Sequence, residues 1–414
     1  MASIKNFLFS LICLAFIVSC QPEKPKNTSP KNGLWYAELE LVKGTSLPFS
    51  FILNNVDSSW KMTILNAEEE IILENLSFKN DSLIAIFPVF ESVIKFKIID
   101  EKKLEGEWVN YYKSKDYKIP ITATFEETTR FETDDSPKKI AEKYAVTFSP
   151  GTDEEYPAIA LFNQNESKVS GTFATETGDY RHLEGVATKD SLYLSTFDGS
   201  HAFLFKAKIS DSTLNGVFWS GKHFKENWQA KINPAAKLTN ADSLTFLKQG
   251  YKKLSFSFPN AQGEKVSLSD KLFENKPVIV QIMGSWCPNC LDETIYFNSL
   301  YKKYNKRGLE VIAIAFERTS GQQKALENLK NLRAKTGADY HFLLGGATRK
   351  DKAEKVLPML NHIMSYPTAI FIDHQGEIKR IHTGFYGPST GKYYKSFTEE
   401  TEHLVEEMLS AAAK

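Results

Sequence analysis

Apolar and polar positions alternate in short segments from about residue 34 to residue 235, and Asn, Asp, Gly and Ser separate these segments. A period of two residues is typical of antiparallel β-strands, because successive side chains of a strand point to opposite faces of its sheet. No long stretch with a helical period occurs in this part of the chain. The pattern therefore predicts an all-β region.

The β region repeats itself at an offset of about 110 residues. Such a period predicts a tandem duplication of one β unit, with the first copy over 34–131 and the second over 139–235. Acidic, proline-containing residues 132–138 would connect the copies. The two copies could close into one barrel or form two small sandwiches, and the pattern does not decide between these arrangements. The matching segments are 80–83 with 189–192, 97–100 with 208–211, 104–106 with 214–216, and 47–48 with 156–157.

A different pattern begins after a linker, residues 236–253, in which a short helix is expected over 241–249. Residues 278–283 are apolar apart from Gln281, as expected of a parallel strand that is buried on both faces. Apolar positions then recur at mostly helical spacing from residue 288, which gives the order strand, helix, strand. The sequence thus predicts a multidomain chain with an α/β domain over 254–414. Helices are expected over 288–305, 321–335, 352–360 and 398–411, and strands over 254–258, 309–316, 340–344, 368–373 and 377–382.

The N-terminus has the features of a secretory signal peptide. Lys5 precedes an apolar run from Phe7 to Val18, which is too short to span a bilayer as a helix. The run ends in Ile-Val-Ser-Cys at 17–20, which resembles a bacterial lipobox. We therefore expect a signal peptide over 1–19, a lipid on Cys20 and a polar tether over 20–33. This predicts a protein of the bacterial cell envelope, anchored to a membrane by lipid and facing the periplasm.

Only two cysteines remain once Cys13 leaves with the signal peptide and Cys20 carries lipid. Cys287 and Cys290 stand where the apolar strand over 278–283 passes into a helix. Cys287 is expected at the helix N-cap, where free backbone N–H groups and the helix dipole stabilise a thiolate. Pro288 suits the first helical position, because its fixed φ is already helical. Cys290, one turn further, would be shielded but able to attack a mixed disulfide.

Three other interpretations of the two cysteines stay open at this point. Zinc binding needs two further ligands, and no other free cysteine exists. A fixed structural disulfide over so short a loop would constrain the chain little. Copper delivery would use the soft thiolates with a downstream His or Met. The available side chains for copper are His341, His362, His374, His382 and Met364, whereas His182, His201 and His223 are scattered in the β region without the spacing of metal ligands.

Residues 254–410 resemble the TlpA and ResA family of thioredoxin-like proteins, within the redoxin superfamily. The Trp-Cys-x-x-Cys motif of that family stands here at Trp286–Cys290, and its acidic residue three positions later is matched by Glu293. Its loop with a cis-proline is matched by Tyr366 and Pro367. The sequence departs from many relatives at Leu291 and Ile295, and its Pro-Asn between the cysteines is unusual. Because these two residues influence thiolate stability, the direction of electron flow is left open, with a lean towards reduction.

The resemblance implies an enzyme that reduces disulfides in exported proteins. Cys287 and Cys290 would be the redox pair, and Glu293 would carry protons to and from the thiols. Trp286, Tyr366 and Pro367 would bind the substrate, with backbone groups of Tyr366 pairing with an extended segment. The partners would be exported proteins and a thiol-reductant donor in the membrane, with no metal and no cofactor.

Two other functions are compatible with the same fold. Peroxide reduction is disfavoured, because a peroxidatic site resembles Thr-x-x-Cys and Gly284 stands at the threonine position. A copper-binding or redox-sensing role for the chain stays possible, because a fold does not fix a function. Electrostatics nominates no partner, since 51 basic residues balance 51 acidic ones and so argue against a nucleic-acid-binding surface.

Overall fold

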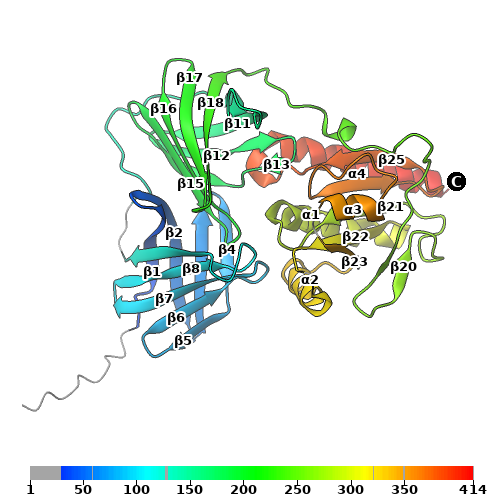
Figure 1. Cartoon of the computed structure of the whole chain (residues 1–414), viewed down its shortest axis with the longest axis horizontal. Coiled ribbons are helices and arrows are strands. Elements are labelled where there is room, and N and C mark those ends of the chain that lie inside the picture. The colour runs from blue at the N-terminus through cyan, green and yellow to red at the C-terminus, as the bar shows by residue number, and fades with distance from the viewer. Residues whose placement is uncertain (1–28, 58, 126–128, 320, 348–349, 414) are drawn as a thin grey trace, which may run out of the picture.

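The structure, a computed structural model, describes residues 29–57, 59–125, 129–319, 321–347 and 350–413. Two β domains precede a C-terminal α/β domain (Figure 1). The expected signal peptide, Cys20 and most of the expected tether lie outside the described residues. Among the residues that are described, no helix is long and apolar enough to cross a membrane.

The first domain is a single antiparallel sheet, coloured blue to cyan in Figure 1. Its strands follow the order β4-β3-β2-β1-β9-β8-β7-β6-β5. Alternating side chains of β1 and β2 point inward, which buries Trp35, Phe49 and Phe51 completely. The strands are β1 (Gly33–Val42), β2 (Thr45–Val56), β3 (Ser59–Asn66), β4 (Glu69–Leu73), β5 (Leu76–Lys79), β6 (Ser82–Ile86), β7 (Ser92–Asp100), β8 (Lys103–Asn110) and β9 (Lys118–Thr124).

The second domain closes into a barrel. Each strand from β10 to β18, apart from β13, pairs with a neighbour on both sides, and the β11–β12 pairing completes the ring. Phe205 stacks between Phe173 and Phe218 in the interior, with ring centroids 4.5 and 4.4 Å away. The strands are β10 (Lys143–Phe148), β11 (Tyr156–Asn165), β12 (Lys168–Thr175), β13 (Gly178–Asp179), β14 (Leu183–Ala187), β15 (Ser191–Phe197), β16 (Ala202–Ile209), β17 (Thr213–Ser220) and β18 (Phe224–Ile232).

The segments that repeat in the sequence lie at corresponding places in the two sheets. Residues 80–83 span the turn between β5 and β6 and the start of β6, and residues 189–192 span the turn between β14 and β15 and the start of β15. The other matches fall on β7 and β16, on β8 and β17, and on β2 and β11. Neither expected arrangement of the copies is found, since each region forms its own sheet and the second closes on itself alone. Along the chain, residues 132–138 lie between β9 of the first sheet and β10 of the second.

The C-terminal domain contains a mixed sheet with the order β23-β22-β21-β24-β25. The strands β21, β22 and β23 are parallel, and β24 and β25 run antiparallel to their neighbours. The strands are β21 (Val278–Met283), β22 (Glu310–Glu317), β23 (His341–Ala347), β24 (Thr368–Ile372) and β25 (Ile378–Thr383), and a separate hairpin joins β19 (Ser257–Pro259) to β20 (Lys265–Ser267). The helices are α1 (Pro288–Tyr304), α2 (Gln322–Thr336), α3 (Lys350–Val356) and α4 (Lys392–Ala412).

Both faces of this sheet are covered, so β21 is buried along its whole length, as predicted. Ile279 and Met283 pack on one face with residues of α1, α2 and α4. Val280 and Ile282 pack on the other face with α3 and with the segment that precedes β21. One polar residue, Gln281, interrupts the apolar strand and is fully buried.

The expected linker helix over 241–249 is wrong apart from one short turn. A 3-10 helix covers only Ala241–Ser243. The following residues pair with the C-terminal domain instead, because Leu247 forms a β-bridge with Leu360 and the Lys248 N–H donates to the Met359 carbonyl. The expected strand over 254–258 is likewise reduced to the start of β19, and the closing helix begins at Lys392, six residues earlier than expected.

Candidate active site

The two cysteines lie at the N-terminus of α1, as the sequence predicts. Cys287 is the N-cap residue and Pro288 follows at the start of the helix. The Cys290 N–H donates to Cys287 Sγ over 3.2 Å, so a helix-terminal N–H points at the sulfur. The two cysteines form a disulfide. Cys290 is fully buried and Cys287 is 7% exposed, so attack from outside is possible only at Cys287.

The loop before β24 lies directly against this disulfide. The peptide bond between Tyr366 and Pro367 is cis, as predicted. The Tyr366 carbonyl oxygen is 3.4 Å from Cys287 Sγ. Trp286 forms the adjacent wall, with its indole N–H donating to the Phe316 carbonyl and its ring edge-on to Tyr366. The residues expected to bind substrate therefore surround the outer sulfur of the pair.

Glu293 is fully buried on α1, one turn beyond Cys290. Gln281 donates an N–H to Glu293 Oε2 over 2.9 Å, and its own carbonyl accepts hydrogen bonds from Thr294 and Tyr340. Burial raises the pKa of Glu293 to about 8, although the hydrogen bond from Gln281 opposes this. The carboxyl is thus protonated at neutral pH. A buried acid that titrates near pH 8 suits proton transfer to and from thiols.

A second buried carboxylate fixes the loop before Cys287. Glu317, at the end of β22, accepts hydrogen bonds from the Ser285 N–H at 2.9 Å and from the Ser285 hydroxyl at 2.7 Å. Burial raises the pKa of Glu317, and the hydrogen bonds from Ser285 oppose this rise. Gly284 has no room for a side chain, because a Cβ there would lie 2.9 Å from the Phe316 carbonyl oxygen and would overlap the ring of Trp286.

The second β domain covers the redox pair. A cleft of about 470 Å³ lies between the second β domain and the C-terminal domain, and residues of both domains form its walls. The turn between β12 and β13 forms one wall, and we call Thr175–Asp179 the covering hairpin. The cleft is also lined by Tyr156, Tyr180, His201 and Phe203 of the barrel and by Trp286, Cys287, Asn289, Met364 and Tyr366 of the C-terminal domain.

Arg181, two residues beyond the covering hairpin, joins all three domains. Its guanidinium is buried and pairs with Glu69 of the first domain and with Asp292 on α1. Asp198 of the barrel lies 3.8 Å from its Nε. Burial raises the pKa of Asp292 to about 6, although Arg181 opposes the rise. Asp292 is therefore a shielded member of this ion-pair network and not a solvated carboxylate on a helix surface.

His201 is the only one of the three histidines of the β region that lines this cleft, as far as the described residues go. Its Nδ1 is 3.1 Å from Asp198, and its ring stacks on Phe203. Burial alone would raise the pKa of Asp198, but His201 and Arg181 hold it below its ordinary value. The neighbouring Ser200 hydroxyl donates to the Trp286 carbonyl over 3.4 Å.

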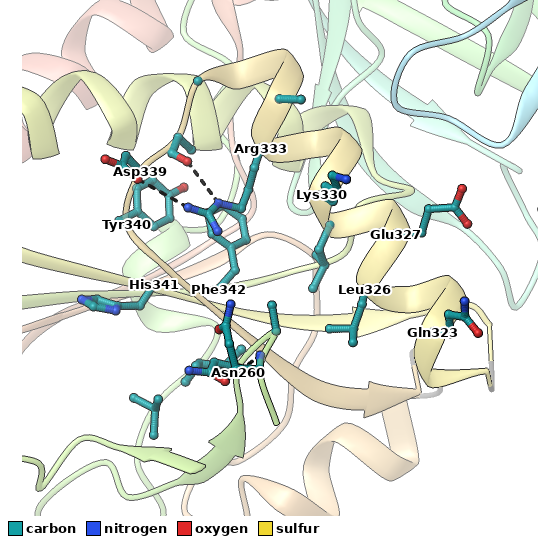
Figure 2. A pocket seen from close by; sticks show the side chains of 18 of the residues that line it. Asn260, Gln323, Leu326, Glu327, Lys330, Arg333, Asp339, Tyr340, His341 and Phe342 are labelled. Carbon is teal, nitrogen blue, oxygen red and sulfur yellow. Dashed lines mark hydrogen bonds and ion pairs between the residues drawn. The ribbon is translucent and has the colours of Figure 1, made fainter. Parts of the chain in front are cut away.

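A second hollow lies elsewhere, away from the two cysteines (Figure 2). It measures about 1150 Å³ and is bounded by α2, β23 and the turn between β19 and β20. Leu326, Lys330 and Arg333 line it along α2, opposite His341 and Phe342 of β23. Of the residues that the sequence nominates for chemistry, only the candidate copper ligand His341 lines this hollow, and Cys287 and Cys290 do not, so its size alone does not make it the site. Within the described ranges, no group of three or more His, Cys, Asp or Glu side chains could hold a metal ion.

Several residues of the site could not be predicted from the sequence. Only one of them stands in a sequence context that indicates a special role. Gln281 is a polar residue inside an apolar strand, which often indicates a buried hydrogen-bond partner. Glu317 stands at the end of another apolar strand, where a charged residue is common and does not indicate a buried contact. Arg181 and Asp292 are 111 residues apart in different domains, and nothing in either segment marks them as partners.

Comparison with known proteins concerns the C-terminal domain. The family model for Redoxin matches residues 248–394. The thiol-disulfide oxidoreductase ResA of Geobacillus kaustophilus is 30% identical over 129 residues, which cover 31% of this chain and 66% of the relative. The ResA of Halalkalibacterium halodurans is 28% identical over 138 residues, which cover 33% of this chain and 69% of the relative.

The C-terminal domain is a TlpA/ResA-like thioredoxin domain. The chain spans 66% of the length of the first of these relatives. Its two β domains lie outside residues 248–394, which the Redoxin model matches. A thiol:disulfide interchange protein of the thioredoxin family from Chlorobium tepidum has a similar structure over 39% of this chain and 98% of its own, with 21% identity and a TM-score of 0.30. Cys287 and Cys290 lie within the segment that the Redoxin model matches.

Proposed function

We propose that the protein is a thiol-disulfide oxidoreductase that reduces disulfides outside the cytoplasm through Cys287 and Cys290. The observation that carries the proposal is the redox pair itself. One sulfur stands at a helix N-terminus against the loop of Pro367, and a buried Glu293 lies behind the other. The matches to thiol-disulfide oxidoreductases named ResA support the same chemistry.

The reaction begins on the reduced pair. The Cys287 thiolate attacks one sulfur of a substrate disulfide, that S–S bond breaks, and the departing sulfur takes up a proton as a thiol. Cys290 then attacks Cys287 Sγ and releases the second substrate thiol, which leaves the Cys287–Cys290 disulfide that the structure contains. Two electrons pass to the substrate. A thiol-reductant donor in the membrane would return them.

In its ionised form, a minor fraction at neutral pH, Glu293 would take the proton from Cys290 as that thiol becomes a nucleophile. Its pKa of about 8 lies close to the ordinary pKa of a cysteine thiol, so a proton can pass between the two groups in either direction. Gln281 holds this carboxyl and is also within 3.4 Å of the Cys290 carbonyl oxygen, to which it donates a weak hydrogen bond. The same side chain therefore contacts both the acid and the inner cysteine.

Location and origin are further parts of the proposal. The signal-peptide pattern over 1–19 and the lipobox at Cys20 support a lipid-anchored protein on the periplasmic side of a bacterial membrane. Exported proteins and the small disulfides of that compartment are then the available substrates. The corresponding places of the repeated segments in the first and second sheets support a tandem duplication, in which the second copy has come to lie over the redox pair.

A trapping experiment tests the proposed chemistry. Cys290→Ser cannot release a mixed disulfide, so it should accumulate covalent partners that dithiothreitol removes, whereas Cys287→Ser should accumulate none. The reduction potential of the pair decides the direction of electron flow, and a reductase should lie near or below about −250 mV. A folded Cys290→Ser protein that forms no mixed disulfide with any disulfide substrate would refute the proposal.

Peroxide reduction is not favoured by the geometry. A threonine three residues before Cys287 would be needed, and the backbone and ring contacts around Gly284 leave no space for one.

A further inference from the structure

The covering hairpin, Thr175–Asp179, lies on the loops that surround Cys287. Its Thr177 carbonyl accepts a hydrogen bond from the Ser365 hydroxyl over 2.8 Å. Its Asp179 carboxylate accepts hydrogen bonds from the Gly387 N–H at 2.6 Å and from the Ser389 hydroxyl at 3.2 Å. In Figure 1 the strand β13 lies at the side of the barrel that faces the thioredoxin-like domain.

The residue inside the redox motif takes part in the same contact. Asn289 donates its side-chain N–H to the Asp179 carbonyl over 3.3 Å. Gly178 has φ +139°, and a Cβ on it would overlap this Asn289 amide and lie 3.3 Å from the Phe385 carbonyl oxygen. The unusual Asn between the cysteines is thus a contact for the hairpin. A glycine at position 178 is required for the close approach.

The hairpin occupies the space that an extended polypeptide substrate would need. The expected substrate-binding groups are the backbone around Tyr366 and Pro367. Ser365 lies on one side of them, and Gly384, whose N–H donates to the Pro367 carbonyl over 2.9 Å, lies on the other. Thr177 contacts Ser365 and also lies against Gly384. A Cβ on Gly384 would be only 2.9 Å from the carbonyl carbon of Thr177. Neighbouring strands lie about 4.8 Å apart, so an extended substrate cannot lie beside Tyr366 and Pro367 while the hairpin occupies that position.

The space that remains next to Cys287 has the size of a small-molecule site. A cleft of about 470 Å³ falls within the usual range for small ligands and is far too small for a folded domain. Tyr156, Phe203, Trp286 and Met364 give it aromatic and apolar walls, which suit the soft sulfur atoms of a disulfide. His201 adds a polar group on the barrel side.

We propose that the covering hairpin determines specificity: with it seated, Cys287 reacts with low-molecular-weight disulfides, and folded proteins that present a disulfide on an extended segment are excluded. This inference rests on the proposed function and deepens it. Arg181 holds the hairpin in place, because its ion pairs with Asp292 and Glu69 tie the chain just beyond Asp179 to the other two domains. Protein substrates reach Cys287 when the hairpin moves away from the loops that surround it.

The test compares two substrates in a single turnover, which needs no electron donor. The chain is reduced chemically, freed of reductant and mixed with an excess of oxidised glutathione or of insulin, and the rate of formation of the Cys287–Cys290 disulfide gives a second-order rate constant. Gly178→Ala should raise the rate constant for insulin at least tenfold, and it should raise the ratio of that constant to the one for oxidised glutathione at least threefold. Gly151→Ala is the matched control, since Gly151 also has positive φ in the same barrel but no atom within 4 Å of its would-be Cβ.

Asp179→Ala provides a second way to release the hairpin if Gly178→Ala fails to fold. Hydrogen exchange at residues 384–387 reports the release directly, because the Gly387 N–H loses its acceptor. Faster exchange with an unchanged ratio of the two rate constants would overturn the inference, as would a wild-type chain that already oxidises faster with insulin. If no variant reacts with either disulfide, the proposed function fails rather than the inference alone.

Discussion

Replacing Glu293 with glutamine should abolish a loss of stability that the wild-type chain suffers as the pH rises. The folded chain holds a proton on Glu293 up to a pKa of about 8, whereas the unfolded chain releases it near 4.5. Between these values the folded state binds more protons, so the free energy of unfolding falls as the pH rises and levels off above about pH 8. Each pKa unit corresponds to about 1.4 kcal/mol, so the whole loss is roughly 5 kcal/mol.

Glutamine keeps the shape of the side chain and can still accept the hydrogen bond from Gln281, but it cannot ionise. The stability of Glu293→Gln relative to wild type should therefore rise by roughly 5 kcal/mol between pH 4.5 and pH 9. Urea unfolding of the oxidised chain, followed by the helical circular dichroism signal, is a suitable measurement. The α-helices of the described residues all lie in the thioredoxin-like domain, so this signal reports its unfolding.

The control is Glu399→Gln, which removes an exposed carboxylate from α4. Its stability should run parallel to that of wild type across the pH range. Parallel curves for Glu293→Gln and wild type would refute the reasoning, because they would mean that Glu293 ionises equally well in the folded and unfolded chains.

Three further substitutions test other parts of the structure. Glu317→Ala leaves the Ser285 N–H without its acceptor and leaves the Ser285 hydroxyl only the Tyr112 hydroxyl at 3.4 Å, so it should cost about 2–3 kcal/mol in urea unfolding and slow the reaction of the reduced chain with oxidised glutathione. Phe205→Ala removes the central ring of the barrel core and should cost roughly 3–5 kcal/mol, with a lowered melting temperature. Arg130→Ala removes a buried guanidinium that donates to the Ser195 carbonyl and to the first domain, and faster hydrogen exchange should appear on both sides of that contact.

The parts of the fold that depend on local pattern could be predicted from the sequence. The apolar run at 278–283 indicated a strand buried on both faces, because only such a position tolerates six buried residues in succession. The position of Cys287 at a helix N-cap followed from Pro288, whose fixed φ suits the first helical turn. The alternation of residues in the N-terminal half indicated strands, but it carries no information on which strand completes a ring. That is why the closure of the barrel could not be foreseen.

The parts of the site that depend on contacts between domains could not be predicted. The hairpin at Thr175–Asp179 has the composition of an ordinary turn, and its role arises only because the barrel places it against Asn289. The helix predicted for the linker is wrong for the same reason. Its own residues favour a helix, but Leu247 instead forms a β-bridge with Leu360 of the C-terminal domain. In each case a tertiary contact overrides a local preference.

The adjacent carboxyls of Asp292 and Glu293 depend on different contacts. Glu293 is set by contacts within the thioredoxin-like domain, whereas Asp292 is set by contacts between domains. Burial raises both pKa values, but different domains bury the two groups. Glu293 points into its own domain, where Gln281 of the central strand contacts it, so its protonation is a property of the thioredoxin-like fold. Asp292 is enclosed by Arg181 of the barrel and by Glu69 beyond it, so its protonation depends on the covering domain being in place. A change that releases the barrel should therefore alter the environment of Asp292 and leave the acid behind Cys290 intact. The proton chemistry of the redox pair and the access to it are, on this basis, separately controlled.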